Sequence, residues 1–319
     1  MHTARGGIVA QGVSRSFGDV KAVRGASFEA HEGRVTGLIG PNGAGKTTLL
    51  LMLSSLLAPD AGTIRIGGID PVQSPAEARQ LLGWMPDSLG AWPALTTRET
   101  LITTGRLYDL DLGTAQARAA YLIELVGLKE LADAPARVLS RGQKQKLGLA
   151  RALVHEPSVL LLDEPASGLD PHARVQLRTL LRRLAAEGCT ILISSHVLSE
   201  LEELIDDAVY LVAGEVVDAP QLGSRARPWR IRTTGEPLTV EHLRDILGAS
   251  ATGIRPERGS MQVIFASETE AVEGLRALVT ADVPVIEFAP AQSALEDTFL
   301  ALENGNPQHP TPTTEEGAA

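Results

Sequence analysis

Residues 40–47 read GPNGAGKT, and an apolar run, VTGLI at 35–39, comes directly before them. A helical pattern at 46–57 follows without a break. In a glycine-rich loop between a strand and a helix, backbone N–H groups can converge on phosphate oxygens, and the positive end of the helix faces the same anion. The stretch therefore matches the pattern G-x-x-x-x-G-K-[ST] in the context that this phosphate-binding loop requires.

The chemistry of this loop predicts a role for each of its side chains. Lys46 is placed to bridge the β- and γ-phosphates of a nucleotide, and the hydroxyl of Thr47 to ligate Mg²⁺. The alternative is a glycine-rich turn without a ligand, and the strand and helix on either side disfavour it. The expected nucleotide-binding residues are Gly40, Pro41, Asn42, Gly43, Ala44, Gly45, Lys46, Thr47 and Thr48.

Further apolar runs indicate the sheet to which this loop belongs. Each run is bounded by Gly, Pro or polar residues and suits a strand buried on both faces, and helical patterns separate the runs, so we predict an α/β core with a parallel sheet. Shorter, half-exposed runs predict an antiparallel flank, and consecutive helical patterns predict an inserted helical subdomain at about 91–154. The buried runs are 82–85, 159–162 and 190–194, and the flanking runs are 8–17, 22–30 and 62–68.

The composition changes at 214–229, which we interpret as a linker between an N-terminal domain, 1–220, and a small α+β domain, 221–303. The order of patterns in the second domain is βαββαβ, which is typical of a ferredoxin-like unit with an extra helix. The tail at 304–319 is rich in Pro, Thr and Glu, and we expect it to be disordered. The predicted elements are strands at 229–234, 252–255, 261–266 and 283–288, and helices at 239–247, 269–280 and 293–303.

Two acids follow a buried strand in VLLLDEP at 159–165. Open α/β sheets bind ligands beyond the carboxyl ends of their strands, so both acids should lie near the phosphates. Because successive strand residues point to opposite faces, we assign Asp163 to Mg²⁺ and Glu164 to the attacking water, as general base. An acidic turn that caps the next helix is the alternative. The strand at 190–194 leads to His196, which could hydrogen-bond the γ-phosphate or be an ordinary surface or core histidine.

Charge and composition exclude several classes of protein. The chain of 319 residues carries 29 Lys and Arg against 39 Asp and Glu, and this balance argues against binding along nucleic acid. Its single cysteine, Cys189, forbids an intrachain disulfide and fits a reducing compartment. The start has no apolar core of signal-peptide length, and the longest apolar stretch, 49–57, is too short to span a bilayer. We therefore expect a soluble chain.

Residues 8–220 resemble the ATPase subunits of ATP-binding cassette (ABC) transporters. The loop at 40–48 is similar to the family's Walker A motif, VLLLDEP to Walker B with its catalytic glutamate, and His196 to the switch histidine. LSRGQ at 139–143 is similar to the signature motif LSGGQ, and ASGLD at 166–170 to the D-loop. Five motifs in the right order and spacing make this resemblance specific.

The resemblance implies that two ATPase subunits pair head to tail, either two copies of this chain or this chain and a sister subunit. The signature of one subunit then closes over the nucleotide of the other, so Ser140, Gly142 and Asp170 become nucleotide-binding residues. The N-terminus of a helix that begins at Ser140 suits an anion. The Lys and Arg side chains at the head of that helix would be attracted to the negative charge of a triphosphate. The alternative for Ser140 is a plain N-cap on a surface helix.

This sequence departs from the family's pattern at two positions. Arg141 replaces the usual glycine of the signature, and Asp87 stands where many members carry the glutamine of the Q-loop. A carboxylate can coordinate Mg²⁺ or water, so we add Asp87 to the metal ligands. Phe17 matches the aromatic residue that stacks on adenine, with burial in the core as the alternative.

The resemblance also implies a membrane permease as partner, which places the chain at the cytoplasmic face of the cell membrane as a peripheral subunit. We expect Trp92 to lie near the permease contact, with burial in the helical subdomain as the alternative. The C-terminal part resembles the accessory domain of exporter-type ATPases. The predicted function is an ATP-hydrolysing transporter subunit, acting in export. A translation or DNA-repair factor of the same superfamily and an ATP-sensing regulator are the alternatives.

Overall fold

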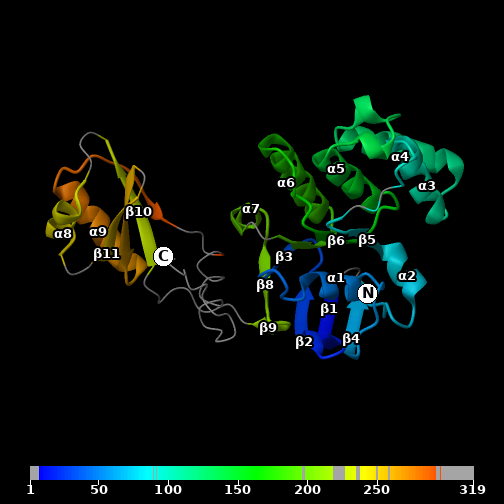
Figure 1. Ribbon diagram of the computed structural model, residues 1–319, viewed down its shortest axis with the longest axis horizontal. Helices are drawn as coiled ribbons and strands as arrows, with labels where there is room; N and C mark the ends of the chain where they lie inside the picture. Colours follow the sequence, from blue (N-terminus) through cyan, green and yellow to red (C-terminus); the bar gives the residue numbers. More distant parts are fainter. Residues whose placement is uncertain are drawn as a thin grey trace, which may run out of the picture. The chain divides into compact units, whose positions relative to one another are not determined.

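The computed structural model describes residues 7–88, 90, 92–195, 198–217, 227–234, 238–248, 251–257, 259–291 and 295. The chain divides into two compact units, Met1–Asp218 and Ala219–Ala319 (Figure 1). In the described residues the first unit has two sheets and the second has one, and each unit has its own buried core.

The first unit is built on a six-stranded sheet whose strands follow the order β5-β6-β7-β3-β8-β9. The first five of these are parallel, and β9 pairs with β8 in the antiparallel sense. Every residue of β3, β6 and β7 is buried, as expected for strands covered on both faces. The strands are β5 (Leu82–Met85), β6 (Val159–Asp163), β7 (Thr190–Ser194), β3 (Val35–Ile39), β8 (Asp207–Val212) and β9 (Glu215–Val217).

A second, antiparallel sheet of order β2-β1-β4 flanks the first, as predicted. Its strands are β1 (Ile8–Phe17), β2 (Val20–Ala30) and β4 (Ala61–Ile66). Helix α1 (Lys46–Leu53) shares one core with apolar residues of both sheets. The helix ends four residues before its predicted limit, because Ser55 adopts a left-handed backbone (φ 59°) that breaks the helical path.

The segment predicted to be helical contains α3 (Thr97–Leu107), α4 (Leu112–Leu125) and α5 (Arg141–Ala152), with short 3₁₀ turns at Lys129–Leu131 and Ala136–Val138. In Figure 1 these helices and α6 (Pro171–Ala186) lie on the side of β5 and β6 away from the antiparallel strands. Two further helices are α2 (Pro75–Leu81) and α7 (Leu198–Glu202). None of the described helices is both long and apolar enough to cross a membrane.

The second unit has a four-stranded antiparallel sheet of order β11-β12-β10-β13. This is the ferredoxin-like order, in which the first and third strands are central. The elements are β10 (Arg227–Thr233), α8 (Val240–Leu247), β11 (Thr252–Glu257), β12 (Ser260–Phe265), α9 (Glu268–Thr280) and β13 (Val285–Pro290).

The predicted linker at 214–229 was wrong at both ends, since 215–217 pair as β9 and 227–229 belong to β10. Its remaining residues, 218–226, lie outside the described residues. So does almost all of the predicted helix at 293–303, together with the whole tail at 304–319.

Candidate nucleotide-binding site

The glycine-rich loop joins β3 to α1 and needs glycine for steric reasons. A Cβ at Gly40 would collide with the carbonyl oxygen of Leu211, and one at Gly45 with that of Ala22. Gly45 also has a φ of 103°, a left-handed backbone that side chains disfavour. As the N-cap of α1, Gly45 offers no side-chain acceptor to the first N–H groups of the helix. Those donors are therefore available to an anion.

Lys46 is folded over this loop. Its Nζ donates to the carbonyl oxygens of Gly40 at 2.6 Å and Pro41 at 3.0 Å. Burial lowers the pKa of its ammonium group, while the nearby acids Glu164 and Asp163 act to raise the pKa. A phosphate oxygen is a stronger acceptor for this ammonium group than the two carbonyls that it now contacts, because the hydrogen bond is then charge-assisted on both sides.

Asp163 ends β6 and is only 3% exposed. Its carboxylate accepts from the hydroxyl of Thr47 at 3.1 Å and from the hydroxyl of Ser194 at 2.5 Å. Ser194 thus holds the acid from the next strand, and the sequence analysis did not include it. The available signal was its position, because it is a polar residue at the carboxyl end of the apolar strand β7.

Glu164 lies just beyond β6 and adopts a left-handed backbone with a φ of 52°. Its N–H lies 3.2 Å from both the carbonyl and the hydroxyl oxygen of Ser194. Strand alternation does not set the direction of Glu164, because β6 ends at Asp163 and Glu164 turns into the left-handed region. Both acids line one hollow, as expected for residues at the end of this strand.

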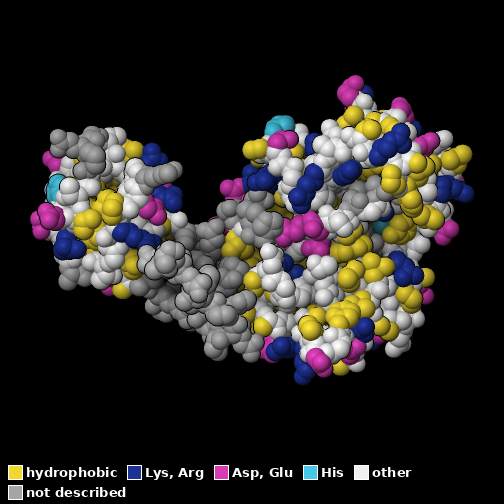
Figure 2. Space-filling view, in the orientation of Figure 1, with side chains coloured by type: hydrophobic (Ala, Val, Ile, Leu, Met, Phe, Trp, Pro, Cys, Tyr) yellow, Lys and Arg dark blue, Asp and Glu magenta, His cyan; other side chains and the backbone are white. Residues whose placement is uncertain are grey.

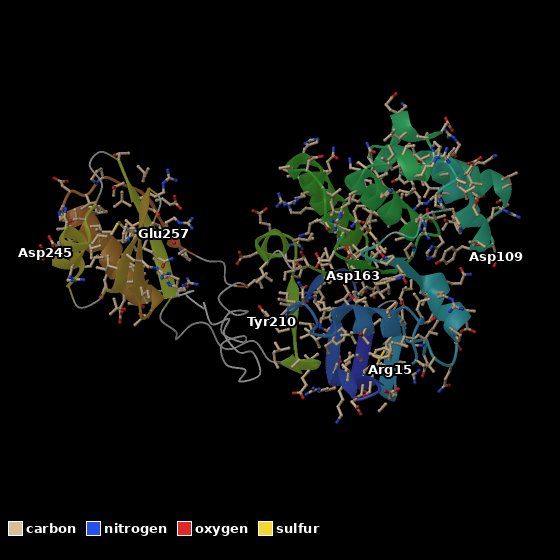
Figure 3. All side chains as sticks on the ribbon, viewed as in Figure 1. Arg15, Asp109, Asp163, Tyr210, Asp245 and Glu257 are labelled. Carbon is tan, nitrogen blue, oxygen red and sulfur yellow. The ribbon has the colours of Figure 1, made fainter. Side chains whose placement is uncertain are left out.

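That hollow, of about 490 Å³, is the candidate site. Asp163, labelled in Figure 3, lies between the antiparallel strands and the helices α5 and α6 in that view. The predicted residues that line the hollow are Asn42, Gly43, Gly45, Lys46, Thr47, Thr48, Asp87, Asp163 and Glu164. The sequence analysis missed five others, Val20, Lys21, Ala22, Arg24 and Ala213. Of the remaining loop residues, Gly40 and Pro41 hold Lys46, and Ala44 is buried.

The donor set around Thr47 fits Mg²⁺. This ion prefers oxygen ligands and keeps several waters, so it needs few protein ligands beside nucleotide phosphates. One hydroxyl and one carboxylate, Thr47 and Asp163, are already in contact, and Asp87 lines the same hollow. Among the described residues no group of three or more His, Cys, Asp or Glu could hold a metal alone.

The predicted residues of the signature and the D-loop, Ser140, Gly142 and Asp170, do not line this hollow, and neither does Phe17. Ser140 is the N-cap of α5, in a capping box with Gln143, and Asp170 is the N-cap of α6. The backbone N–H of Ala173, which donates to Asp170, is the main cause that lowers the pKa of this carboxyl. The signature and the D-loop are close neighbours, because a Cβ at Gly142 would lie 2.8 Å from the carbonyl oxygen of Gly168.

Two aromatic residues that could have been core residues are on the surface. Phe17 is 50% exposed, with the guanidinium of Arg15 at 5.1 Å from its ring centroid. Trp92 is 40% exposed, with the guanidinium of Arg151 at 5.5 Å from its ring centroid. The burial alternatives for both rings were therefore wrong. His196 lies outside the described residues.

A phosphate-binding loop after a central parallel strand, facing an acid at the end of a nearby strand, defines a P-loop nucleoside triphosphatase. Comparison with known proteins gives the family. The model of the family described as ABC transporter matches residues 23–167. The chain belongs to the ATP-binding proteins of ABC transporters, and it is an ATPase of that class, with a domain that binds ATP.

The similar curated proteins include two named Nod factor export ATP-binding protein I. The one from Burkholderia lata is 46% identical over 206 residues, which cover 64% of this chain and 67% of the relative. The one from Ralstonia nicotianae is 35% identical over 301 residues, 92% of both chains. The linearmycin resistance ATP-binding protein of Bacillus subtilis is 36% identical and covers 65% of this chain and 67% of the relative. These relatives favour a transporter ATPase over a translation factor, a DNA-repair factor or a regulator.

Solved structures agree on the fold. The ATP-binding subunit of an ABC transporter matches with a TM-score of 0.63 at 28% identity, covering 67% of this chain and 90% of that one. A dimeric bacterial ABC transporter cassette matches with the same TM-score at 24% identity, and this likeness concerns the fold alone.

Proposed function

We propose that two subunits, two copies of this chain or this chain and a sister, hold ATP between them and that its hydrolysis drives export through a separate membrane permease. The main support is the placement of the site residues. The loop, Asp163 and Glu164 face one hollow, whereas Ser140, Gly142 and Asp170 lie elsewhere on the same unit. A signature that does not line its own hollow suits the nucleotide of a partner, and one structural neighbour is a dimeric cassette.

In this proposal the chain's residues divide the work on the triphosphate. Lys46 exchanges its two carbonyl acceptors for phosphate oxygens, and Thr47 with Asp163 and Asp87 would hold Mg²⁺, which neutralises charge on the phosphates. Glu164 orients the attacking water and accepts its proton. Phe17 stacks on the adenine with the ring face that Arg15 leaves open, and His196 contacts the γ-phosphate.

Export and the permease are proposed from the relatives' names, which speak of Nod factor export, of linearmycin resistance and of an ABC transporter. Through the permease the chain would be a peripheral subunit at the cytoplasmic face of the membrane. ATP binds the closed pair more tightly than the open pair, so its binding shifts the equilibrium toward closure, and hydrolysis allows the pair to reopen. This cycle of closing and reopening would drive the movement of the permease.

The central test is Glu164→Gln, measured as phosphate release with Mg-ATP. We expect turnover to fall roughly 10²–10⁴-fold, the usual effect of losing a general base, while ATP still binds. The matched control is Glu156→Gln, because Glu156 is also a left-handed acid (φ 55°) but forms a surface ion pair with Arg118. Wild-type turnover in Glu164→Gln would refute the assignment.

A mixing experiment tests whether the signature acts on the partner's nucleotide. Lys46→Ala removes the ammonium group of the phosphate-binding loop, and Gly142→Ala disturbs the signature. Each variant alone should therefore be inactive. A mixed pair would contain one intact site, the loop of one chain with the signature of the other. Mixing should therefore restore part of the activity. If the mixture stays as inactive as its components, two chains do not share the nucleotide.

We also propose that Trp92 lies at the permease contact. The ring is exposed on the helical part of the unit and is held by Arg151. Trp92→Ala should weaken co-purification with the permease and leave ATP binding unchanged. Tyr121→Ala is the control, because Tyr121 is 49% exposed on the same helical part and is held by Arg118 in the same way. Equal association of both variants would place the contact elsewhere.

A further inference from the structure

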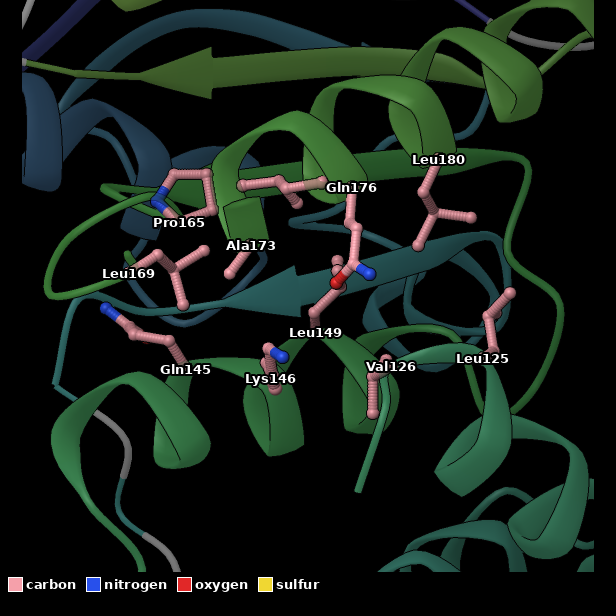
Figure 4. A pocket seen from close by; sticks show the side chains of 11 residues that line it. Leu125, Val126, Gln145, Lys146, Leu149, Pro165, Leu169, Ala173, Gln176 and Leu180 are labelled. Atoms are coloured by element: carbon pink, nitrogen blue, oxygen red, sulfur yellow. The ribbon is translucent and has the colours of Figure 1, made fainter. Parts of the chain in front are cut away.

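Gln145 is a buried polar residue on α5, and it does not line the nucleotide hollow. Its side chain is 3% exposed and borders an apolar groove between α5 and α6 (Figure 4). In Figure 4 it extends from α5 toward the segment that follows β6, where Pro165 and Leu169 lie. Burying an amide in such surroundings costs free energy unless the amide forms hydrogen bonds there.

The amide nitrogen of Gln145 reaches two backbone carbonyls from different parts of the site. Its Nε2 lies 3.3 Å from the carbonyl oxygen of Glu164 and 3.5 Å from that of Asp87. A primary amide has two N–H donors, so one nitrogen can serve both. The two carbonyls belong to residues that do line the hollow, one after β6 and one after β5.

The oxygen of this amide, Oε1, is buried and has no hydrogen-bond partner in the part of the chain that the structure describes. Turning the amide over would direct this oxygen at two carbonyl oxygens, which only accept, so the contacts fix the amide as it stands. In this orientation Nε2 of Gln145 donates to the carbonyls of Glu164 and Asp87, and Oε1 stays without a hydrogen bond among the described residues.

The backbone of Glu164 needs such support. Its left-handed conformation is unfavourable for a residue with a Cβ, and it persists only where its surroundings hold it. Ser194 holds its N–H, while its carbonyl accepts from Gln145 and from the N–H of Ser167. Rotation of this peptide would swing the Glu164 carboxylate away from the hollow.

We propose that Gln145 is a positioning residue that ties α5, the helix headed by the signature, to the backbone of Glu164. This inference rests on the proposed role of Glu164 as general base. Gln145 sits about one turn inside the helix capped by Ser140. A shift of that helix end, when a partner's triphosphate docks on Ser140, would move the carbonyl of Glu164 and bring its carboxylate into line. The contact would make hydrolysis depend on closure of the pair.

The test is Gln145→Met, which keeps the length of the side chain and removes both donors. Turnover per bound ATP should fall about 10- to 100-fold, the scale of a misplaced catalytic group, with the KM for ATP within about twofold of wild type. The thermal midpoint should stay within about 3 °C, since the variant also removes the unsatisfied oxygen. Gln176→Met is the matched control, because Gln176 lines the same groove but bonds only His172 in the described structure.

A double-mutant cycle separates this inference from the proposed function. If Gln145 acts through the Glu164 carboxylate, adding Gln145→Met to Glu164→Gln should lower the residual turnover no further. Additive losses would show that Gln145 has only a general structural role and would overturn the inference. Wild-type turnover in Gln145→Met would overturn it as well. Wild-type turnover in Glu164→Gln would instead overturn the proposed function.

Discussion

His155 is a partly buried histidine that does not line the nucleotide hollow, and we expect it to give the protein a specific response to acid. Its Nε2 lies 3.2 Å from the carbonyl oxygen of Leu82, and its ring stacks on Tyr108 with centroids 3.7 Å apart. Because a carbonyl only accepts, Nε2 carries the proton of the neutral ring, and Nδ1 is buried without a partner in the described structure. Burial lowers the pKa of His155 from 6.5 to about 4.

This lowered pKa predicts acid sensitivity. Between pH 6.5 and 4 the unfolded chain protonates His155 and the folded chain does not, so the free energy of unfolding falls by up to about 3 kcal/mol. His155→Phe should remove this part of the pH dependence, measured by urea unfolding from pH 7 to 4. Tyr108→Phe keeps both the stack and the titrating ring, and it should retain the wild-type slope. The same slope in His155→Phe would contradict the assignment.

The roles of single residues could be predicted where the functional residues form one contiguous motif. The loop at 40–48 and the acid Asp163 needed only local spacing and the rule that ligands bind at strand ends. The same rule could have found Ser194 at the end of β7, but not its contact with Asp163, which spans 31 residues. Gln145 could not be found this way, because it lies inside a helix and its contact with Glu164 spans 19 residues. Nor could the left-handed turn of Glu164 be predicted, since an acid after a strand does not reveal its φ.

At the scale of the element, α5 begins with a structural device that is also part of the proposed site. Ser140 accepts from the N–H of Gln143, and the Gln143 side chain accepts from the N–H of Ser140. Thr96 and Glu99 form the same capping box at the start of α3. The N-cap that was the alternative for Ser140 is therefore present, and it does not exclude a role toward a partner's nucleotide.

The two capping boxes allow these roles to be separated. Ser140→Ala and Thr96→Ala should each cost about 1 kcal/mol of stability, the usual loss of an N-cap. Only Ser140→Ala should also lower ATP turnover, by about tenfold or more, because only this hydroxyl would face a triphosphate. Ser140→Asp should keep the cap and the stability but lose turnover by charge repulsion. Parallel turnover losses at Ser140 and Thr96 would show that capping alone matters.

Element types could be predicted from periodicity, whereas several element limits could not. Continuous apolar runs predicted four of the five parallel strands, β3, β5, β6 and β7, because strands covered on both faces carry no alternation. The fifth, β8, was not predicted. The end of α1 depends on a left-handed serine, and the short edge strand β9 depends on pairing with β8 rather than on its own three residues. Both are tertiary or backbone effects that hydrophobic pattern does not encode.

At the scale of the whole molecule, the two units differ in what they contain. The first contains the loop, the acids and the signature, and its core joins both sheets around α1. The second is a small sheet with two helices over a separate core that includes Leu243 and Phe265. The order of elements in this second unit could be predicted from the patterns of its strands and helices, although the pattern of β11 is weak, since this strand is mostly exposed.

Separate cores predict separate unfolding transitions of the full chain, measured by calorimetry. Leu38 and Leu243 are both fully buried, one in each core, so Leu38→Ala should lower only the first unit's transition and Leu243→Ala only the second, each by roughly 2–5 kcal/mol. Mg-ATP at about 100 times its Kd should stabilise the first unit alone, by about 2.7 kcal/mol. A single transition that both variants lower and that Mg-ATP raises as a whole would mean that the two cores unfold as one.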